Sequence, residues 1–411
     1  MNFLNILNQN NGVSMKNPVL SNNVFKTIIY IIILFPFIQQ RTYSELPKWI
    51  SKFYIIYSII SSTIIYIFIF LKRKYNPFIN KQWLFYLFWF LYLISTLINC
   101  YLNIDYVFYY AYISIAVVSF IFYSSKKDIN TLIQALSIIY GIFIFLNGLL
   151  FIFNPTGIYQ TQSYHNGHLL GDDNAIIYVA LPGLIIIICN SILKRKKISL
   201  ISWFLLIITE YTFYKLWAVS SLVCLSIFII LLIYTLRKNS PNPKTLFIVI
   251  FCVIFFMIFG FSNTFLQKII ITVLKKDITL SGRTYIWKQA INLISNRLIL
   301  GYGGYFTYGK FKPSINSWLL YPSHTPFLQL AIDGGIFLLL TFIIITFIAY
   351  IEASKHKKNL YSRVLSIGLT CMLLNYVTEY SQTIHYMIIV SLMFCIKNNN
   401  IEGGNNYEIS K

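Results

Sequence analysis

Arg283, His324 and Asp333, in the last third of the chain, have side chains suited to chemistry on an anionic substrate. An arginine presents a planar fork of donors that matches the oxygens of a phosphate or a pyrophosphate. His324 precedes Thr325 and Pro326, which are favoured residues at the start of a helix. The positive end of that helix would favour a bound anion and a neutral imidazole, which can act as a general base. A plainer interpretation is that Arg283 reaches lipid headgroups and His324 hydrogen-bonds a loop carbonyl.

A helix from about residue 283 to residue 297 is expected to position Arg283. Trp287, Ala290, Ile291 and Ile294 recur at helical spacing, so this helix would have one apolar face. We expect that face to lie on a membrane surface, with Arg283 in the first turn at the boundary between membrane and water.

Two glycine-containing segments follow this helix. The segment LGYGGY at 300–305 allows positive φ and a close approach of backbone to a ligand, although it is not a P-loop. Asp333 lies about two turns into the next apolar segment, where an acid is costly unless it is paired or hydrated. It is therefore a functional candidate, or else it pairs with a basic residue of the preceding loop. Gly334 and Gly335 are expected to allow close helix packing.

The composition places these residues in an all-α, polytopic integral membrane protein. The chain has 411 residues, of which 57% are hydrophobic and 11% charged, with a mean hydropathy of +0.67. Such values exclude an ordinary soluble domain. Apolar runs long enough to cross a bilayer predict about twelve transmembrane helices. The expected spans lie near residues 25–38, 53–71, 83–101, 106–123, 131–153, 174–193, 198–214, 216–236, 245–262, 326–351, 362–380 and 383–396.

The positions of Lys and Arg predict that both termini are cytoplasmic. With that orientation most of the 33 basic residues fall in the tails and in the connections on the inner side, among them the run KRKK at 194–197. The chain then divides into 1–262 with nine spans, an extracytoplasmic loop at 263–325, three further spans at 326–396 and a cytoplasmic tail at 397–411. The outer loop nevertheless carries eight basic residues against the single acid Asp277: Lys268, Lys275, Lys276, Arg283, Lys288, Arg297, Lys310 and Lys312.

The same distribution argues against nucleic acid as a partner, and the sequence gives little support for a metal. The basic clusters are scattered between spans and form no continuous groove, although the formal net charge is +21. His165, His168, Asp172 and Asp173 lie in one outer loop, but their spacing matches no standard zinc motif. The six Cys residues stand singly, with no C-x-x-C pair. We therefore expect neither a metal nor another cofactor, and this outer loop is expected to cap the sixth span.

These motifs together resemble the O-antigen ligase and polymerase superfamily, which includes the polysaccharide-repeat polymerases of capsule and exopolysaccharide pathways. The stretches that carry the resemblance are GRTYIW at 282–287, LILGYGGY at 298–305 and HTPFLQLAIDGG at 324–335. DDNAIIYVALPG at 172–183 resembles a polar loop of that family that leads into a span. Two positions depart from the family pattern: Thr325 stands where Asn is frequent, and Arg297 matches the second loop arginine only loosely.

The resemblance implies a metal-independent glycosyltransferase in the bacterial cytoplasmic membrane. Its substrate would be an oligosaccharide linked to undecaprenyl diphosphate, and its partners would include membrane lipid and the flippase and chain-length regulator of the pathway. Arg283 would neutralise the leaving diphosphate, His324 would act as base for the acceptor hydroxyl, and Asp333 would orient His324. Substrate contacts are expected from a further set of residues: Arg297, Trp287, Gly303 and Lys288.

Three other functions remain open at this stage. A ligase would transfer the finished chain from the same carrier to another acceptor, and the sequence barely separates it from a polymerase. A flippase or ion-coupled transporter would have ionisable residues or broken helices at mid-membrane, whereas the ionisable residues here gather at the outer boundary. A non-catalytic scaffold of a glycan assembly complex would tolerate the loss of Arg283 and His324.

Overall fold

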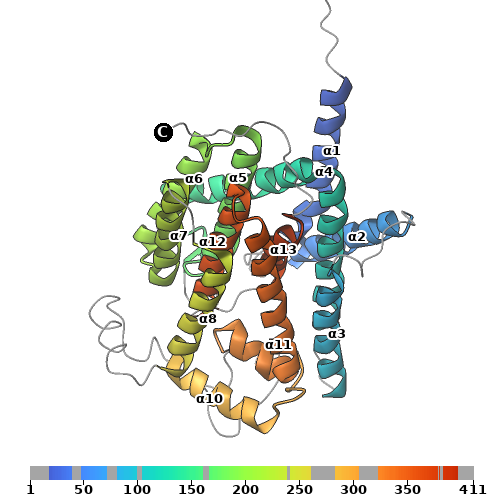
Figure 1. Ribbon diagram of the computed structural model, residues 1–411, viewed down its shortest axis with the longest axis vertical. Coiled ribbons are helices and arrows are strands. Elements are labelled where there is room, and N and C mark those ends of the chain that lie inside the picture. The colour runs from blue at the N-terminus through green and yellow to red at the C-terminus, as the bar shows by residue number, and fades with distance from the viewer. Residues whose placement is uncertain are drawn as a thin grey trace, which may run out of the picture.

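The computed structural model describes residues 18–38, 48–71, 81–99, 104–160, 166–237, 241–260, 283–304, 323–377, 379 and 383–396. Figure 1 shows that helices packed side by side make up nearly all of this part, which confirms the all-α class. Their bounds are α1 Pro18–Leu34, the 3-10 helix η1 Phe35–Phe37, α2 Lys48–Leu71, α3 Trp83–Ile98, α4 Ile104–Phe153, α5 Ile176–Arg195, α6 Leu200–Leu216, α7 Val219–Arg237, α8 Pro243–Phe259, α10 Arg283–Asn296, α11 Pro326–Lys355, α12 Leu360–Asn375 and α13 Thr383–Phe394.

A helix coincides with every expected span in the described residues. By length and composition, α2, α4, α5, α7 and α11 are long and apolar enough to cross a membrane, and several shorter helices are apolar. Many large apolar side chains on the outside of the bundle are exposed, for example Phe70 (84%) and Ile230 (64%). Such a surface is what a protein surrounded by lipid presents, because lipid chains impose no cost on exposed apolar groups.

The fourth and fifth expected spans form the single helix α4, which has a sharp bend. Asp128 has the non-helical angles φ −159° and ψ 79°. Its carboxylate accepts a hydrogen bond from the backbone N–H of Thr131 (3.1 Å), which is the geometry of an N-cap. The two expected spans are therefore distinct, and Asp128 begins the second one.

Helix α11 is broken at Gly335, which has φ +71° and ψ −169°. The turn at 298–303 lies against this break through three backbone hydrogen bonds: Ile336 N to Leu298 O (2.7 Å), Tyr302 N to Ile332 O (2.7 Å) and Gly303 N to Asp333 O (2.8 Å). A Cβ at Gly335 would lie 2.0 Å from the carbonyl oxygen of Ile299. The expected close packing of helices was wrong for Gly335. This glycine instead allows the backbone of the turn at 298–303 to contact the backbone of α11 at its break.

The loop between α4 and α5 contains a small antiparallel sheet that the sequence did not predict. Its strands are β1 Tyr159–Gln160, β2 Asn166–His168 and β3 Gly171–Asp172, in the order β1-β2-β3. Asp172 accepts a hydrogen bond from the N–H of Ala175, just before α5 (3.1 Å). The loop thus covers the start of the sixth span, as expected.

Helix α10 lies across one end of the bundle (Figure 1). The helix has nearly the expected bounds, but its apolar face does not lie on a membrane surface. Ile286, Trp287 and Ala290 are buried within the protein, and α10 packs on α11. The expected contact of this face with the membrane is wrong, because Trp287 finds its apolar partners and a hydrogen-bond acceptor inside the fold.

Candidate functional site

Arg283, the first residue of α10, forms an ion pair with Glu379. Both side chains are largely buried, with exposed fractions of 18% and 8%. The hydroxyl of Tyr178, on α5, donates to the second carboxylate oxygen of Glu379 (3.2 Å). One carboxylate therefore joins α10, the segment after α12 and the first turn of α5. The sequence placed Glu379 at a span end, as it did Glu210 and Lys215, where these residues would either line one cavity or anchor the helices at the interface. Tyr178 gave no signal in the sequence.

Trp287 connects the start of α10 to the segment that carries His324. Its indole N–H donates to the carbonyl of Ser323 (3.0 Å), and its side chain is fully buried. Arg283 and Trp287 are one helical turn apart, so they lie on the same face of α10. His324 follows Ser323 directly, is half-buried and has φ +54°. The structure thus brings the His324 segment to the face of α10 that carries Arg283.

Asp333 lies inside the protein, below this segment. It is 1% exposed, and both carboxylate oxygens accept hydrogen bonds: from Tyr92 Oη (2.6 Å) and from Gln329 Nε2 (2.8 Å). The amide oxygen of Gln329 in turn accepts the backbone N–H of Ser323 (3.0 Å). A chain of hydrogen bonds therefore runs from Asp333 through Gln329 to the residue that precedes His324.

Arg297 and Lys288 lie away from Arg283. Arg297 follows the other end of α10, about 20 Å away at 1.5 Å per residue. Its guanidinium donates to Asn99 Oδ1 (2.7 Å) and lies over the ring of Tyr302 (4.8 Å). Lys288 is exposed, on a different face of α10.

Gly303 is also engaged within the fold, because its N–H is used in the backbone hydrogen bond to Asp333. A phosphate would have to displace that bond before the amide could bind it. The remaining parts of the expected outer loop, residues 261–282 and 305–322, lie outside the described residues, as does His165.

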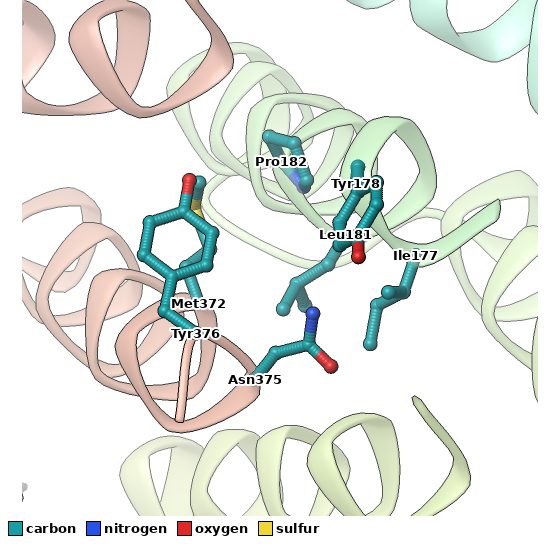
Figure 2. A pocket seen from close by; sticks show the side chains of 7 residues that line it. All are labelled: Ile177, Tyr178, Leu181, Pro182, Met372, Asn375 and Tyr376. Carbon is teal, nitrogen blue, oxygen red and sulfur yellow. The ribbon is translucent and has the colours of Figure 1, made fainter. Parts of the chain in front are cut away.

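A small pocket opens between α5 and α12, beside Glu379. Figure 2 shows Tyr178 on the α5 side and Asn375 and Tyr376 on the α12 side of this pocket. The complete lining is Ile177, Tyr178, Leu181, Pro182, Met372, Asn375 and Tyr376. Glu379 is tied to the same wall because its N–H donates to the carbonyl of Asn375 (3.1 Å).

The loop between α4 and α5, which raised the question of a metal, shows no metal-binding arrangement in its described part. No group of three or more His, Cys, Asp or Glu side chains suited to a metal ion occurs among the described residues. His168 is instead packed inside, 2% exposed, with its ring 5.4 Å from that of Phe151. Its Nε2 atom has no hydrogen-bond partner among the described residues, and burial lowers the pKa of its imidazole.

Residues 169–343 match the model of a family described as O-Antigen ligase. This range contains Arg283, His324 and Asp333 together with the two glycine segments that meet at the break of α11. This match supports membership of the O-antigen ligase and polymerase superfamily. A search of curated proteins found no match.

Membership of the O-antigen ligase and polymerase superfamily indicates a multi-pass membrane enzyme of surface glycan assembly. The matched range covers Tyr178, α10 and the first part of α11, and it ends before Asn375 and Glu379. The contact between Arg283 and Glu379 therefore joins the matched range to the last part of the chain.

Proposed function

We propose that the protein is a polymerase that joins undecaprenyl-diphosphate-linked repeat units at the outer face of the bacterial cytoplasmic membrane. The observation that carries the proposal is the position of Arg283, whose helix also holds the His324 segment through Trp287. An arginine and an imidazole on neighbouring segments at one end of an apolar bundle suit a lipid-linked diphosphate, whose charged group lies at the membrane boundary.

In the proposed reaction, an acceptor sugar hydroxyl attacks the anomeric carbon of the donor. The new C–O bond forms as the bond between that carbon and the diphosphate oxygen breaks, and the lipid diphosphate leaves with the bonding electrons. His324 takes the hydroxyl proton and becomes imidazolium. Arg283 stabilises the negative charge that develops on the diphosphate, so this role is assigned to a guanidinium and not to a metal ion.

Two acidic residues are proposed to hold Arg283 and His324 in position. Glu379 accepts from one nitrogen of the Arg283 guanidinium, whose five N–H groups leave further donors for phosphate oxygens. Asp333 acts on His324 indirectly, through Gln329 and Ser323, and is therefore proposed as a positioning residue.

The remaining assignments belong to the same proposal. Both termini would be cytoplasmic, and α10 would lie outside. Trp287 and Gly303 would shape the site from within, whereas Lys288 and Arg297 would attract the anionic substrate or lipid headgroups to the outer surface. The flippase and the chain-length regulator of the same pathway are the expected protein partners.

A ligase is the second candidate, because the matched family is described by that activity. It would use the same donor and the same charge stabilisation but another acceptor. The arrangement of Arg283 and His324 is compatible with a polymerase and with a ligase, so the glycan that the protein produces must distinguish the two activities.

Complementation of a deletion strain tests the proposal. Arg283→Ala should lower the polymerisation rate about 10²–10³-fold and His324→Ala about 10²–10⁴-fold, with single repeat units retained on a glycan gel. Lys244→Ala is the control, because it removes an exposed positive charge from the first turn of α8, which has no part in the proposed site. Long chains that form but stay unattached would support the ligase, accumulation of lipid-linked units on the inner face would support a flippase, and unchanged glycan would support a scaffold.

A further inference from the structure

We infer that Arg297 binds the diphosphate of the acceptor, so that the two lipid diphosphates of the reaction lie at opposite ends of α10. The inference rests on the proposed function, because a polymerase uses an acceptor that is itself linked to a lipid diphosphate. Arg283 is the first residue of α10 and would hold the diphosphate that leaves. Arg297 follows the last residue of this helix and would hold the diphosphate that stays on the acceptor.

The proposed reaction requires such a second site at some distance from the first. The attacking hydroxyl belongs to a sugar away from the lipid, whereas the diphosphate of the acceptor remains on the anomeric carbon at the other end of the repeat unit. When the new C–O bond forms, one repeat unit therefore lies between the two diphosphates. His324, the proposed base, is near the Arg283 end of α10, because Trp287 holds the preceding residue. An oligosaccharide of a few sugars can extend from there along α10, over about 20 Å.

The two arginines lie on nearly the same side of α10. They are about four turns apart, so their side chains leave the helix in similar directions. Arg283 pairs with Glu379 in the segment after α12, and Arg297 donates to Asn99 Oδ1 just after α3 (2.7 Å). Both guanidinium groups therefore contact the end of the bundle that α10 covers, at two separate places (Figure 1).

The Arg297 side chain is exposed and yet held in place. Its guanidinium lies over the ring of Tyr302, 4.8 Å from the ring centroid, and the Tyr302 hydroxyl donates to the carbonyl of Leu293 (3.2 Å). The other partner, Asn99, donates its side-chain amide to the carbonyl of Ser95 (2.7 Å). No carboxylate of the described residues pairs with Arg297. The N–H groups that Asn99 does not accept can therefore bind phosphate oxygens.

The surface beside Arg297 suits the lipid part of such a ligand. Leu298 and Ile299 follow Arg297, and Leu97 and Ile98 end the neighbouring helix α3. All four apolar side chains are between 51% and 61% exposed. A fixed cation beside exposed apolar side chains matches a ligand that has its phosphate groups at the membrane boundary and its hydrocarbon chain in the bilayer.

Two acceptors that cannot act as donors separate the diphosphate contact from the rest of the site. In the first, the repeat unit is linked to undecaprenyl diphosphate with CH2 in place of the anomeric oxygen. The second is the methyl glycoside of the same repeat unit, which has no phosphate. The donor is a labelled lipid-linked repeat unit, and the initial rate of label transfer to each acceptor is measured with the full-length protein in nanodiscs.

Arg297→Gln should raise the KM of the CH2-linked acceptor about tenfold or more, because a hydrogen-bonded charge is lost from its diphosphate. The KM of the methyl glycoside should change less than about twofold. Lys244→Gln removes an exposed positive charge from the first turn of α8 and should change neither KM. Equal changes for the two acceptors in Arg297→Gln would overturn the inference, since Arg297 would then serve phospholipid headgroups or the fold.

A second variant protects the test against misfolding. Arg297→Lys keeps the charge but loses the planar fork of donors, so it should raise the KM of the CH2-linked acceptor about threefold or more and leave that of the methyl glycoside unchanged. Loss of transfer to both acceptors in both variants would also overturn the inference. If instead the wild-type protein transfers label to neither acceptor, the proposed function itself fails.

Discussion

At the scale of single residues, the charged groups of the proposed site differ in their partners, since Arg283 pairs with an acid and Asp333 has neutral donors. Arg283 and Glu379 share a largely buried ion pair, and a carboxylate inside such a pair competes with an incoming anion for the same guanidinium. The diphosphate must therefore share or replace the contact with Glu379. In contrast, the carboxylate of Asp333 lies deeper and is held by two neutral donors, Tyr92 and Gln329.

Removal of the negative charge at residue 379 should strengthen the binding of the leaving group. Glu379→Gln keeps a similar shape but ends the repulsion between its carboxylate and the diphosphate, so the inhibition constant of undecaprenyl diphosphate should fall about three- to tenfold. The reaction should also slow, because Arg283 loses its orienting partner. Glu352→Gln is the control: Glu352 pairs with Lys81 and Lys355 on the far part of α11. A weaker inhibition by undecaprenyl diphosphate in Glu379→Gln would contradict this account.

The hydrogen bond from Tyr92 to Asp333 should contribute measurably to stability. Tyr92→Phe leaves one oxygen of a buried carboxylate without this donor, and the expected loss is about 1.5–3 kcal/mol. The measurement is thermal unfolding in detergent. Tyr57→Phe removes a bond to the backbone carbonyl of Ile32 at an exposed position and should cost less, about 0.5–1.5 kcal/mol. Equal losses in the two variants would argue against a special role for the carboxylate.

At the scale of elements, the position of His324 depends on a turn that meets a broken helix. Gly301 and Gly335 both have positive φ, and each comes so close to the opposite backbone that a Cβ would collide with it. The break turns the first part of α11 away from the rest of the helix, and that part carries Gln329 and Asp333. Two glycine motifs that are separate in the sequence are therefore one structural unit.

Gly335→Ala should disrupt this unit. The new Cβ would lie 2.0 Å from the oxygen of Ile299 at a φ of +71°, and we expect a loss of at least about 2 kcal/mol together with loss of glycan elongation. Gly141→Ala is a matched control, because it lies within α4 and its nearest neighbour would be 3.9 Å away. Unfolding temperature and complementation of the deletion strain measure both effects. A Gly335→Ala protein as stable as the wild type would show that the turn and the helix can separate without cost.

The small sheet before α5 should make stability sensitive to acid. Burial lowers the pKa of His168 below its ordinary value of 6.5, so the unfolded chain binds more protons than the folded one as pH falls below that value. The stability associated with the neutral imidazole is complete above about pH 6.5 and is lost as pH falls toward the folded pKa. The unfolding temperature of the wild type should therefore fall more than that of His168→Gln between about pH 7.5 and about pH 5.5. Parallel falls in the two proteins would exclude His168 as the cause.

At the scale of the whole molecule, ion pairs mark both ends of the bundle. Lys81 and Lys355 pair with Glu352 and join the start of α3 to the end of α11, whereas Arg283 and Glu379 join α10 to the segment after α12. Between these ends many large apolar side chains are exposed. In the proposed orientation the first group faces the cytoplasm and the second faces outward.

Cysteine labelling in intact cells should reveal this orientation. In a variant without native cysteines, Lys288→Cys on α10 should react with a membrane-impermeant maleimide, because its position is exposed and proposed to be outside. Lys357→Cys, equally exposed beyond the far end of α11, should react only after the cells are opened. The opposite pattern would reverse the orientation and place the proposed site in the cytoplasm.

The sequence by itself determined which segments are helices that suit a bilayer, and it selected Arg283, His324 and Asp333. These features are local: apolar runs have a length, and residue types such as Arg, His and intramembrane Asp stand out one at a time. Only the tertiary structure decided their partners. Tyr178 and Gln329 are ordinary in the sequence, and Glu379 is there only a charged residue at a span end. All three gain their roles through contacts that the fold creates. The pocket, the buried position of Trp287 and the fit of one glycine turn onto a helix break likewise depend on segments far apart in the chain, whose pairing no local pattern specifies.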